Sequence, residues 1–182
     1  MRKMYTVFIL LVITAVLFSA CGESSASQAQ GVAALSTDIE ILEAAVEIEP
    51  DPHAAALSIF EMLERDVPEK LTVDGLAEHY GLAAEYFTDF AVFRSTAERG
   101  LADIAIIRPA PDRRDDVRER LLSYRDARMD EFRNYDILDA YAISGNAIIF
   151  NQGYYVVMFM LTDNELAQDI LDTYISPNTS NG

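Results

Sequence analysis

The sequence predicts an α+β domain built on a four-stranded antiparallel sheet. Two pairs of short apolar runs, 90–95 with 102–108 and 140–151 with 154–162, are each separated by a few turn-forming residues, which is typical of β-hairpins. Stretches with helical spacing of apolar residues precede, separate and follow the two pairs. The predicted order is therefore helix, helix, strand, strand, helix, strand, strand, helix (ααββαββα), with the helices packed on the sheet.

Two helices are expected to open this domain. The first follows Pro52 and is stopped by Pro68. The second spans residues 73–80, with Asp74 near its start and Gly81 at its C-terminal cap position.

The first predicted hairpin joins strands 90–95 and 102–108 through a turn at Arg99 and Gly100. The longest helix of the domain then begins at Asp112 and continues to about residue 135.

The second predicted hairpin has its first strand within residues 140–151 and its second over residues 154–162, with Gly153 suited to a left-handed turn position. Both alternating faces of strand 154–162 are apolar, so both must be covered. We expect the long helix to cover one face, and either the helices between residues 53 and 80 or the last helix, 164–175, to cover the other.

The first twenty residues have the pattern of a secretory leader. Arg2 and Lys3 precede an apolar run, residues 7–18, that is broken only by Thr14. Twelve helical residues reach about 18 Å, which is shorter than the roughly 30 Å hydrocarbon core of a bilayer. Residues 1–20 are therefore predicted to be a signal peptide and not a membrane-spanning helix.

Cys21, the only cysteine, follows the small residues Ser19 and Ala20. This junction resembles the bacterial lipoprotein signal, in which Leu and two small residues precede Cys; here Leu17 lies one place early and Phe18 takes the usual Leu position. The resemblance implies cleavage before Cys21, a diacylglyceryl thioether on its sulfur, and anchoring to the extracytoplasmic face of the cell membrane. The alternative is an ordinary leader, cut nearby, that leaves a free thiol in an oxidising compartment.

The acidity of the chain excludes some partners. Removal of residues 1–20 takes away two basic and no acidic residues, so the formal net charge changes from −16 to −18. Nucleic acid is not expected as a partner, because its phosphates require Lys and Arg. Self-repulsion that favours solubility is the ordinary explanation, and binding of cations or of a basic partner is the alternative.

The chain is predicted to divide into four parts: the signal peptide 1–20, a flexible acidic tether 21–52, the α+β domain 53–176 and a disordered tail 177–182. The tether begins with Gly, Ser, Ala and Gln, a composition typical of flexible linkers. Its second half is ambiguous between a weak helix and a disordered spacer, because Thr37 and Glu40 fit a capping box. With Cys21 lipidated, no disulfide can form, and we expect one monomeric domain that is stabilised by its core alone.

Three segments of the domain carry a family resemblance: the strand 102–107 (Ala-Asp-Ile-Ala-Ile-Ile), the charged helix near 115–130, and the hairpin of 146–149 with 153–157. With these segments, residues 57–175 resemble a family of uncharacterised lipoproteins from Gram-positive bacteria, chiefly clostridial, which is known only as a domain of unknown function. The resemblance implies a location and a fold. It implies no activity, because the shared residues are core and turn residues.

The sequence predicts no catalytic residue, no metal ligand and no cofactor. His53 and His79 are the only histidines; they belong to no ligand motif, and His79 fits the C-terminal end of a helix. No His-Glu-x-x-His and no Gly-x-Ser-x-Gly motif occurs.

Pairs of carboxylates are frequent, as expected by chance in a chain with 30 acidic residues. The last pair is expected to cap the final helix, and calcium binding stays open although the EF-hand pattern is absent. The pairs are Asp115–Asp116, Asp130–Glu131, Asp136–Asp139 and Asp163–Glu165.

Two hypotheses for function follow. The first, which we favour, is a non-catalytic module tethered to the membrane through Cys21 that binds a protein or cell-wall component. The second is a small envelope hydrolase that uses acidic residues in a cleft, as glycosidases do. An acidic cleft would favour the hydrolase, and an open apolar face would favour the binding module.

Overall fold

The structure is a computed structural model, and it describes residues 50–177. The predicted signal peptide, Cys21, the tether before residue 50 with its Thr37–Glu40 capping box, and the end of the tail lie outside the described residues.

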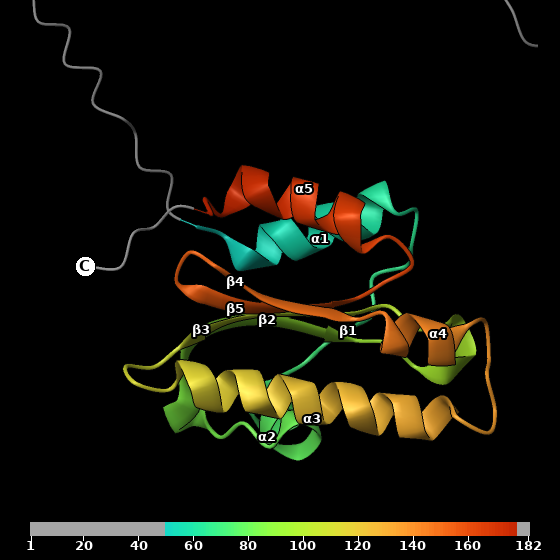
Figure 1. Cartoon of the computed structure of the whole chain (residues 1–182). Helices are drawn as coiled ribbons and strands as arrows, with labels where there is room; N and C mark the ends of the chain where they lie inside the picture. The colour runs from blue at the N-terminus through green and yellow to red at the C-terminus, as the bar shows by residue number, and fades with distance from the viewer. Residues whose placement is uncertain (1–49, 178–182) are drawn as a thin grey trace, which may run out of the picture. The chain divides into compact units, whose positions relative to one another are not determined.

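The described part of the chain has three layers, with helices on both faces of one sheet (Figure 1). Helices α1 (Pro52–Met62) and α5 (Asn164–Tyr174) cover one face, and α2 (Val73–Tyr80) and α3 (Arg114–Phe132) cover the other. The short helix α4 (Ala140–Gly145) packs against α3. The strands are β1 (Glu69–Lys70), β2 (Phe87–Arg94), β3 (Asp103–Pro109), β4 (Ile148–Gln152) and β5 (Tyr155–Met160), and two 3-10 turns are η1 (Ala84–Tyr86) and η2 (Ala97–Arg99).

The sheet has the order β1-β2-β3-β5-β4, and all neighbouring strands are antiparallel. The two predicted hairpins are β2–β3 and β4–β5, and they join along β3 and β5. In the β4–β5 turn, Gly153 has a φ of 56°, as predicted for a left-handed position. The α+β class and the antiparallel sheet are therefore confirmed.

Local sequence signals explain the helix ends. Pro52 occupies the first turn of α1, and the Asp51 side chain accepts a hydrogen bond of 2.8 Å from the Ala54 amide. Helix α2 has the predicted bounds and ends at Gly81, whose φ of 64° is left-handed. Helix α1, in contrast, ends at Met62, several residues before Pro68.

The predicted number of strands is wrong, because the sheet has five strands and not four. The additional strand, β1, contains only Glu69 and Lys70 and is defined by its pairing with β2; the Leu71 amide next to it donates to the Val92 carbonyl at 2.8 Å. Two residues cannot show an alternating pattern, so the sequence contained no periodic signal for this strand.

The predicted order is also wrong between residues 140 and 147, where the structure has helix α4 and not the start of a strand. Ala140, Ile143 and Ser144 are buried, and their spacing is helical. The Asp136 carboxylate accepts a hydrogen bond of 2.8 Å from the Tyr141 amide in the first turn. The observed order is α, β, α, β, β, α, α, β, β, α.

Both faces of β5 are buried, as predicted from its apolar alternation. Val157 and Phe159 pack in the core below α1 and α5. Val156 and Met158 pack in the core that α2 and α3 cover. The two helices between residues 53 and 80 are thus divided between the faces of the sheet.

Candidate functional site

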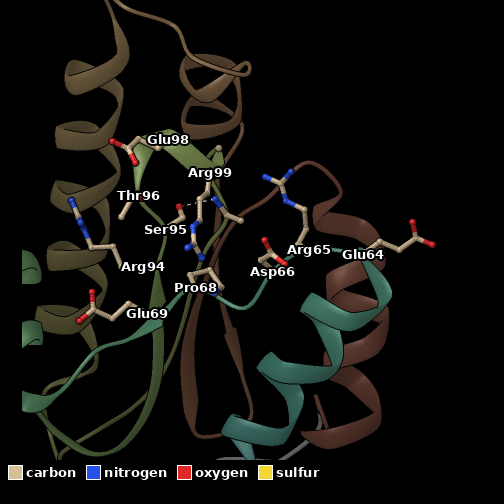
Figure 2. Close-up of a pocket in the computed structure, with 12 residues that line it drawn as sticks. Glu64, Arg65, Asp66, Pro68, Glu69, Arg94, Ser95, Thr96, Glu98 and Arg99 are labelled. Atoms are coloured by element: carbon tan, nitrogen blue, oxygen red, sulfur yellow. Dashed lines mark hydrogen bonds between the residues drawn. The ribbon is translucent and has the colours of Figure 1, made fainter.

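A cleft of about 550 Å³ opens at one end of the sheet, where the loop after α1 meets β1 and the β2–β3 connection (Figure 2). The uncharged residues that line this cleft are Pro68, Ser95, Thr96, Gly100 and Ala102. The remaining lining residues are charged. We refer to this feature as the charged cleft.

The charged cleft contains both signs of charge. Arg65, Arg94 and Arg99 contribute three guanidinium groups, although the whole chain has only 14 basic residues against 30 acidic ones. None of the seven charged side chains forms an ion pair within the described part of the chain. The four carboxylates of the cleft belong to Glu64, Asp66, Glu69 and Glu98.

Two of the arginines have distinctive surroundings. The Arg65 guanidinium donates to the Leu101 carbonyl at 3.4 Å, and it lies 3.1 Å from the position that a Cβ atom on Gly100 would occupy. Gly100 has a φ of 80°, so this position requires both a left-handed backbone and space for the guanidinium. The Nε atom of Arg94 is buried and has no hydrogen-bond partner in the described part of the chain.

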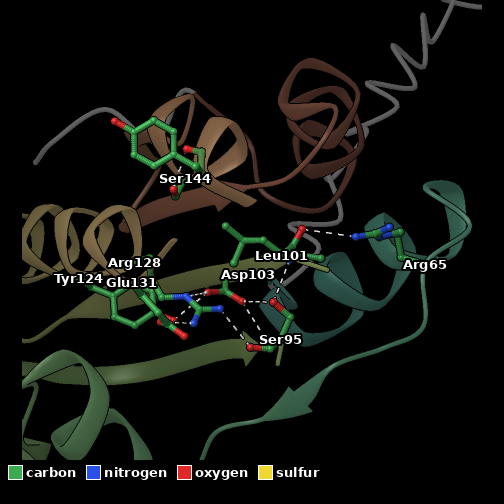
Figure 3. Close-up of polar contacts among 10 residues, drawn as sticks. Arg65, Ser95, Leu101, Asp103, Tyr124, Arg128, Glu131 and Ser144 are labelled. Carbon is green, nitrogen blue, oxygen red and sulfur yellow. Dashed lines mark hydrogen bonds and ion pairs between the residues drawn. The ribbon is translucent and has the colours of Figure 1, made fainter. Parts of the chain in front are cut away.

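Behind the charged cleft, Asp103 is the centre of a buried polar network (Figure 3). One carboxylate oxygen, Oδ1, accepts hydrogen bonds from the Ser95 amide at 2.7 Å and from the Ser95 hydroxyl at 2.6 Å. The other, Oδ2, accepts from the Tyr124 hydroxyl at 2.8 Å and from Arg128 Nε at 3.2 Å. Four donors therefore hold a carboxylate whose residue is fully buried.

Arg128 connects this network to the long helix and to the cleft wall. Its Nη2 donates to the Ser95 carbonyl at 3.1 Å, and its Nη1 donates to Glu131 Oε2 at 2.7 Å. The residue is 2% exposed. Because buried charges require partners, this set of contacts fixes Ser95, and with it one wall of the cleft, against α3.

Ser95 is not arranged as a catalytic nucleophile. Its hydroxyl donates to Asp103 and accepts a hydrogen bond of 2.9 Å from the Ala102 amide. Both oxygens of Asp103 are already engaged, because Oδ2 accepts hydrogen bonds from Tyr124 and Arg128, and Oδ1 accepts from the Ser95 amide as well as from the hydroxyl. The geometry therefore supports a structural role for the hydroxyl.

Two tyrosines extend the network to α2. Burial, and then the negative charge of Asp103, raise the pKa of Tyr124 far above its ordinary value. Tyr80 stacks on Tyr124 with ring centroids 3.8 Å apart, and its buried hydroxyl has no hydrogen-bond partner in the described region. Burial and the proximity of Tyr124 and Asp103 raise the pKa of Tyr80 as well. Both hydroxyls are therefore protonated at neutral pH.

The two histidines lie on opposite faces of the sheet and do not meet. His53, in α1, stacks on Phe93 with ring centroids 5.6 Å apart. His79 is exposed in the last turn of α2, where its predicted interaction with the helix C-terminus is geometrically available. Within residues 50–177, no group of three or more His, Cys, Asp or Glu side chains is placed to hold a metal ion.

Each acidic pair that the sequence singled out contributes at least one side chain to an ion pair or to a helix start outside the charged cleft. Asp116 pairs with Arg113 at 2.9 Å, and Asp130 pairs with Arg133. Asp163 caps α5, as predicted, by accepting from the Leu166 amide at 2.9 Å. The carboxylates that do line the cleft were missed, because they come from three separate segments and form no motif.

Comparison with known families gives a match to the larger part of the domain. A family model described as "Domain of unknown function (DUF4358)" matches residues 63–161. No curated protein and no solved structure matches the chain. Among the described residues, no helix is long and apolar enough to cross a membrane.

The match covers more than half of the 182 residues and extends from the end of α1 to the end of β5. It includes every residue of the charged cleft and of the Asp103–Arg128 network. The chain therefore belongs to the DUF4358 family of domains of unknown function.

Proposed function

We propose that the protein is a lipid-anchored binding module on the extracytoplasmic face of the cell membrane, and that the charged cleft is its binding surface. One observation supports this choice of surface above all: seven charged side chains line one cleft and form no ion pairs among the described residues. A network of buried hydrogen bonds supports the cleft wall at Ser95. Rigid support of this kind reduces the entropic cost of binding.

The anchor is supported by the sequence. A basic and apolar leader precedes two small residues and Cys21. The described domain begins 29 residues after Cys21 at Pro50, so the intervening chain is long enough to separate the domain from the lipid. Repulsion between the acidic domain and anionic lipid head groups would favour the same separation.

Neither of the two surfaces considered above, an open apolar sheet face or an acidic cleft, describes the binding surface that we propose. Helices cover both faces of the sheet, so an open apolar sheet face does not support binding. The charged cleft is polar, and its three arginines distinguish it from the acidic cleft expected of a hydrolase. A hydrolase that uses the four cleft carboxylates is the alternative, and turnover of a cell-wall substrate by the purified protein would favour it.

The anchor is tested with Cys21→Ser. We expect this variant to move from the membrane fraction to the medium or to accumulate as the uncut precursor. Ser25→Ala, which changes a nearby residue and keeps the cysteine, is the control and should remain membrane-bound. A Cys21→Ser protein that is cut normally and stays in the membrane would show that the lipid assignment is wrong.

The binding surface is tested by crosslinking in intact cells, followed by isolation of the protein and its partners. Arg99→Glu reverses one exposed charge of the cleft, and Arg133→Glu reverses one exposed charge on α3. We expect the first variant to lose the crosslinked protein or wall fragment and the second to retain it. Identical products from both variants would exclude the charged cleft as the binding surface.

A further inference from the structure

We infer that the charged cleft binds a zwitterionic ligand, namely a short peptide that has both a free carboxylate and a free ammonium group. This inference rests on the proposed function, because it specifies the ligand class of the same cleft. It follows from the combination of charges, from their arrangement, and from one buried donor that lacks a partner.

The combination of charges disfavours ligands of a single sign. An anion would be attracted by Arg65, Arg94 and Arg99 but repelled by the four neighbouring carboxylates and by the net charge of the chain. A cation would meet the opposite conflict at the three guanidinium groups. A ligand with both signs can place each charge beside its complement. A guanidinium matches a carboxylate with two parallel hydrogen bonds, and a carboxylate accepts from an ammonium group.

The charged side chains of the cleft reach into it from two segments of the chain (Figure 2). Arg65 and Asp66 follow α1, and Arg99 extends from the β2–β3 connection toward Pro68. We assign the ligand carboxylate to Arg65 and Arg99, and the ammonium group to Asp66. The hydrogen bond from Arg65 to the Leu101 carbonyl orients one guanidinium before the ligand binds.

Arg94 provides a separate indication of a ligand. Buried donors are nearly always satisfied, yet the Nε of Arg94 has no acceptor in the described part of the chain. Arg94 also lines the cleft, whose volume of about 550 Å³ falls in the usual range for small-ligand sites. A peptide carbonyl oxygen or a carboxylate oxygen offers an acceptor of the required type, and a short peptide with a free carboxylate has both.

The inference is tested by calorimetric titration of the purified full-length chain in non-ionic detergent. The probes are alanyl-alanine, its N-acetylated form, which is only anionic, and its C-terminal amide, which is only cationic. We expect the unmodified dipeptide to bind, and each blocked form to bind at least about tenfold more weakly, which corresponds to about 1.4 kcal/mol.

Two cleft variants assign the subsites. Arg99→Gln should weaken the binding of alanyl-alanine about tenfold, so that this variant binds the dipeptide no more tightly than its C-terminal amide. Asp66→Asn should bind the dipeptide no more tightly than its N-acetylated form. Arg133→Gln and Asp130→Asn, which change an exposed ion pair on α3, are the matched controls and should bind like the unmodified chain. Because Arg99 and Asp66 are exposed, their variants should keep the melting temperature of the parent.

Equal binding of all three peptides, or no binding of alanyl-alanine at millimolar concentrations, would overturn the zwitterion assignment. The proposed function has a separate test, because a crosslinked partner that Arg99→Glu loses and Arg133→Glu keeps would still identify the cleft as a binding surface. If the unmodified dipeptide is not preferred and Arg99→Glu crosslinks like Arg133→Glu, both proposals are overturned.

Discussion

Arg128 on α3 and Asp103 on β3 form an ion pair inside the domain, with Nε 3.2 Å from Oδ2 and side chains that are 3% and 0% exposed. The pair connects the longest helix to the central strand of the sheet. Through Ser95, which contacts both residues, it also supports the wall of the charged cleft. The same pair therefore contributes to the stability of the domain and to the shape of the cleft.

Replacement of Arg128 by Met should lower the free energy of unfolding by about 3–5 kcal/mol, because it leaves the Asp103 carboxylate buried without a counter-charge. Urea denaturation of the variant and the parent measures the difference. Arg133→Met, which removes an exposed ion pair, is the control and should cost less than about 1 kcal/mol. A similar small loss for Arg128→Met would mean that water or a rearranged side chain compensates the buried carboxylate.

Stability should decrease at high pH partly because of Tyr155. Burial, and then the negative charge of Asp89, raise the pKa of Tyr155 to about 12, and its hydroxyl donates to Asp89 Oδ2 at 3.1 Å. In the unfolded chain a tyrosine loses its proton near pH 10, so from about pH 10 upward the unfolded state binds fewer protons than the folded state. The contribution is complete below pH 10 and is lost as the pH rises toward 12.

The corresponding measurement is the free energy of unfolding between neutral pH and pH 12. Tyr155→Phe should show a smaller decrease above about pH 10 than the parent, although Tyr80 and Tyr124 will leave part of the slope. Tyr141→Phe changes an exposed tyrosine and should leave the slope unchanged. Parallel curves for the Tyr155 variant and the parent would contradict the raised pKa.

The two covered faces of β5 predict that a carboxylate is not tolerated on either side. Val157→Asp and Met158→Asp each bury an unpaired charge at a fully buried position, at a cost of several kcal/mol, comparable to a total stability of about 5–15 kcal/mol. Both variants should be unfolded by circular dichroism. Tyr154→Asp, in the β4–β5 turn immediately before β5 and 44% exposed, should remain folded. A folded Val157→Asp or Met158→Asp protein would show that one face is accessible to water.

Alanine should have different effects on stability at two glycines, Gly81 after α2 and Gly145 in α4. Gly81 has a φ of 64°, so Gly81→Ala should destabilise the domain by about 1–2 kcal/mol. Gly145 lies in α4 without a positive φ, and a Cβ atom there would meet only Met129 Cε at an ordinary 3.7 Å. Gly145→Ala should therefore be neutral or stabilising by about 0.5–1 kcal/mol in thermal or urea unfolding. Equal effects at the two positions would exclude the left-handed cap as the cause.

Much of the fold could be predicted because the signals are local. The bounds of α2 follow from its apolar spacing and Gly81, and the β4–β5 turn follows from Gly153 between two apolar runs. The burial of both faces of β5 follows from its apolar alternation. Each of these depends on residues that are close together in the chain, where side-chain spacing and backbone preferences are sufficient.

The remaining features depend on contacts between distant segments. Strand β1 exists only because two residues pair with β2, and α4 forms in an apolar stretch whose Ala140 and Ile143 can pack beside α3. The same sequence stretch was compatible with a strand, so its period alone did not distinguish the two structures.

The sequence by itself determined most of the elements of an α+β domain, and its prediction of a secretory leader before Cys21 stays a prediction. Only the tertiary structure decided which charged residues meet. Asp103 was visible as a charge within an apolar strand, but its partner lies 25 residues away on a helix. Arg65 and Arg99 share the charged cleft because the loop after α1 and the β2–β3 connection converge at the same end of the sheet. Strand order and helix packing place these groups together, and both are set by the burial of apolar surface over the whole chain and not by the spacing of the charged residues.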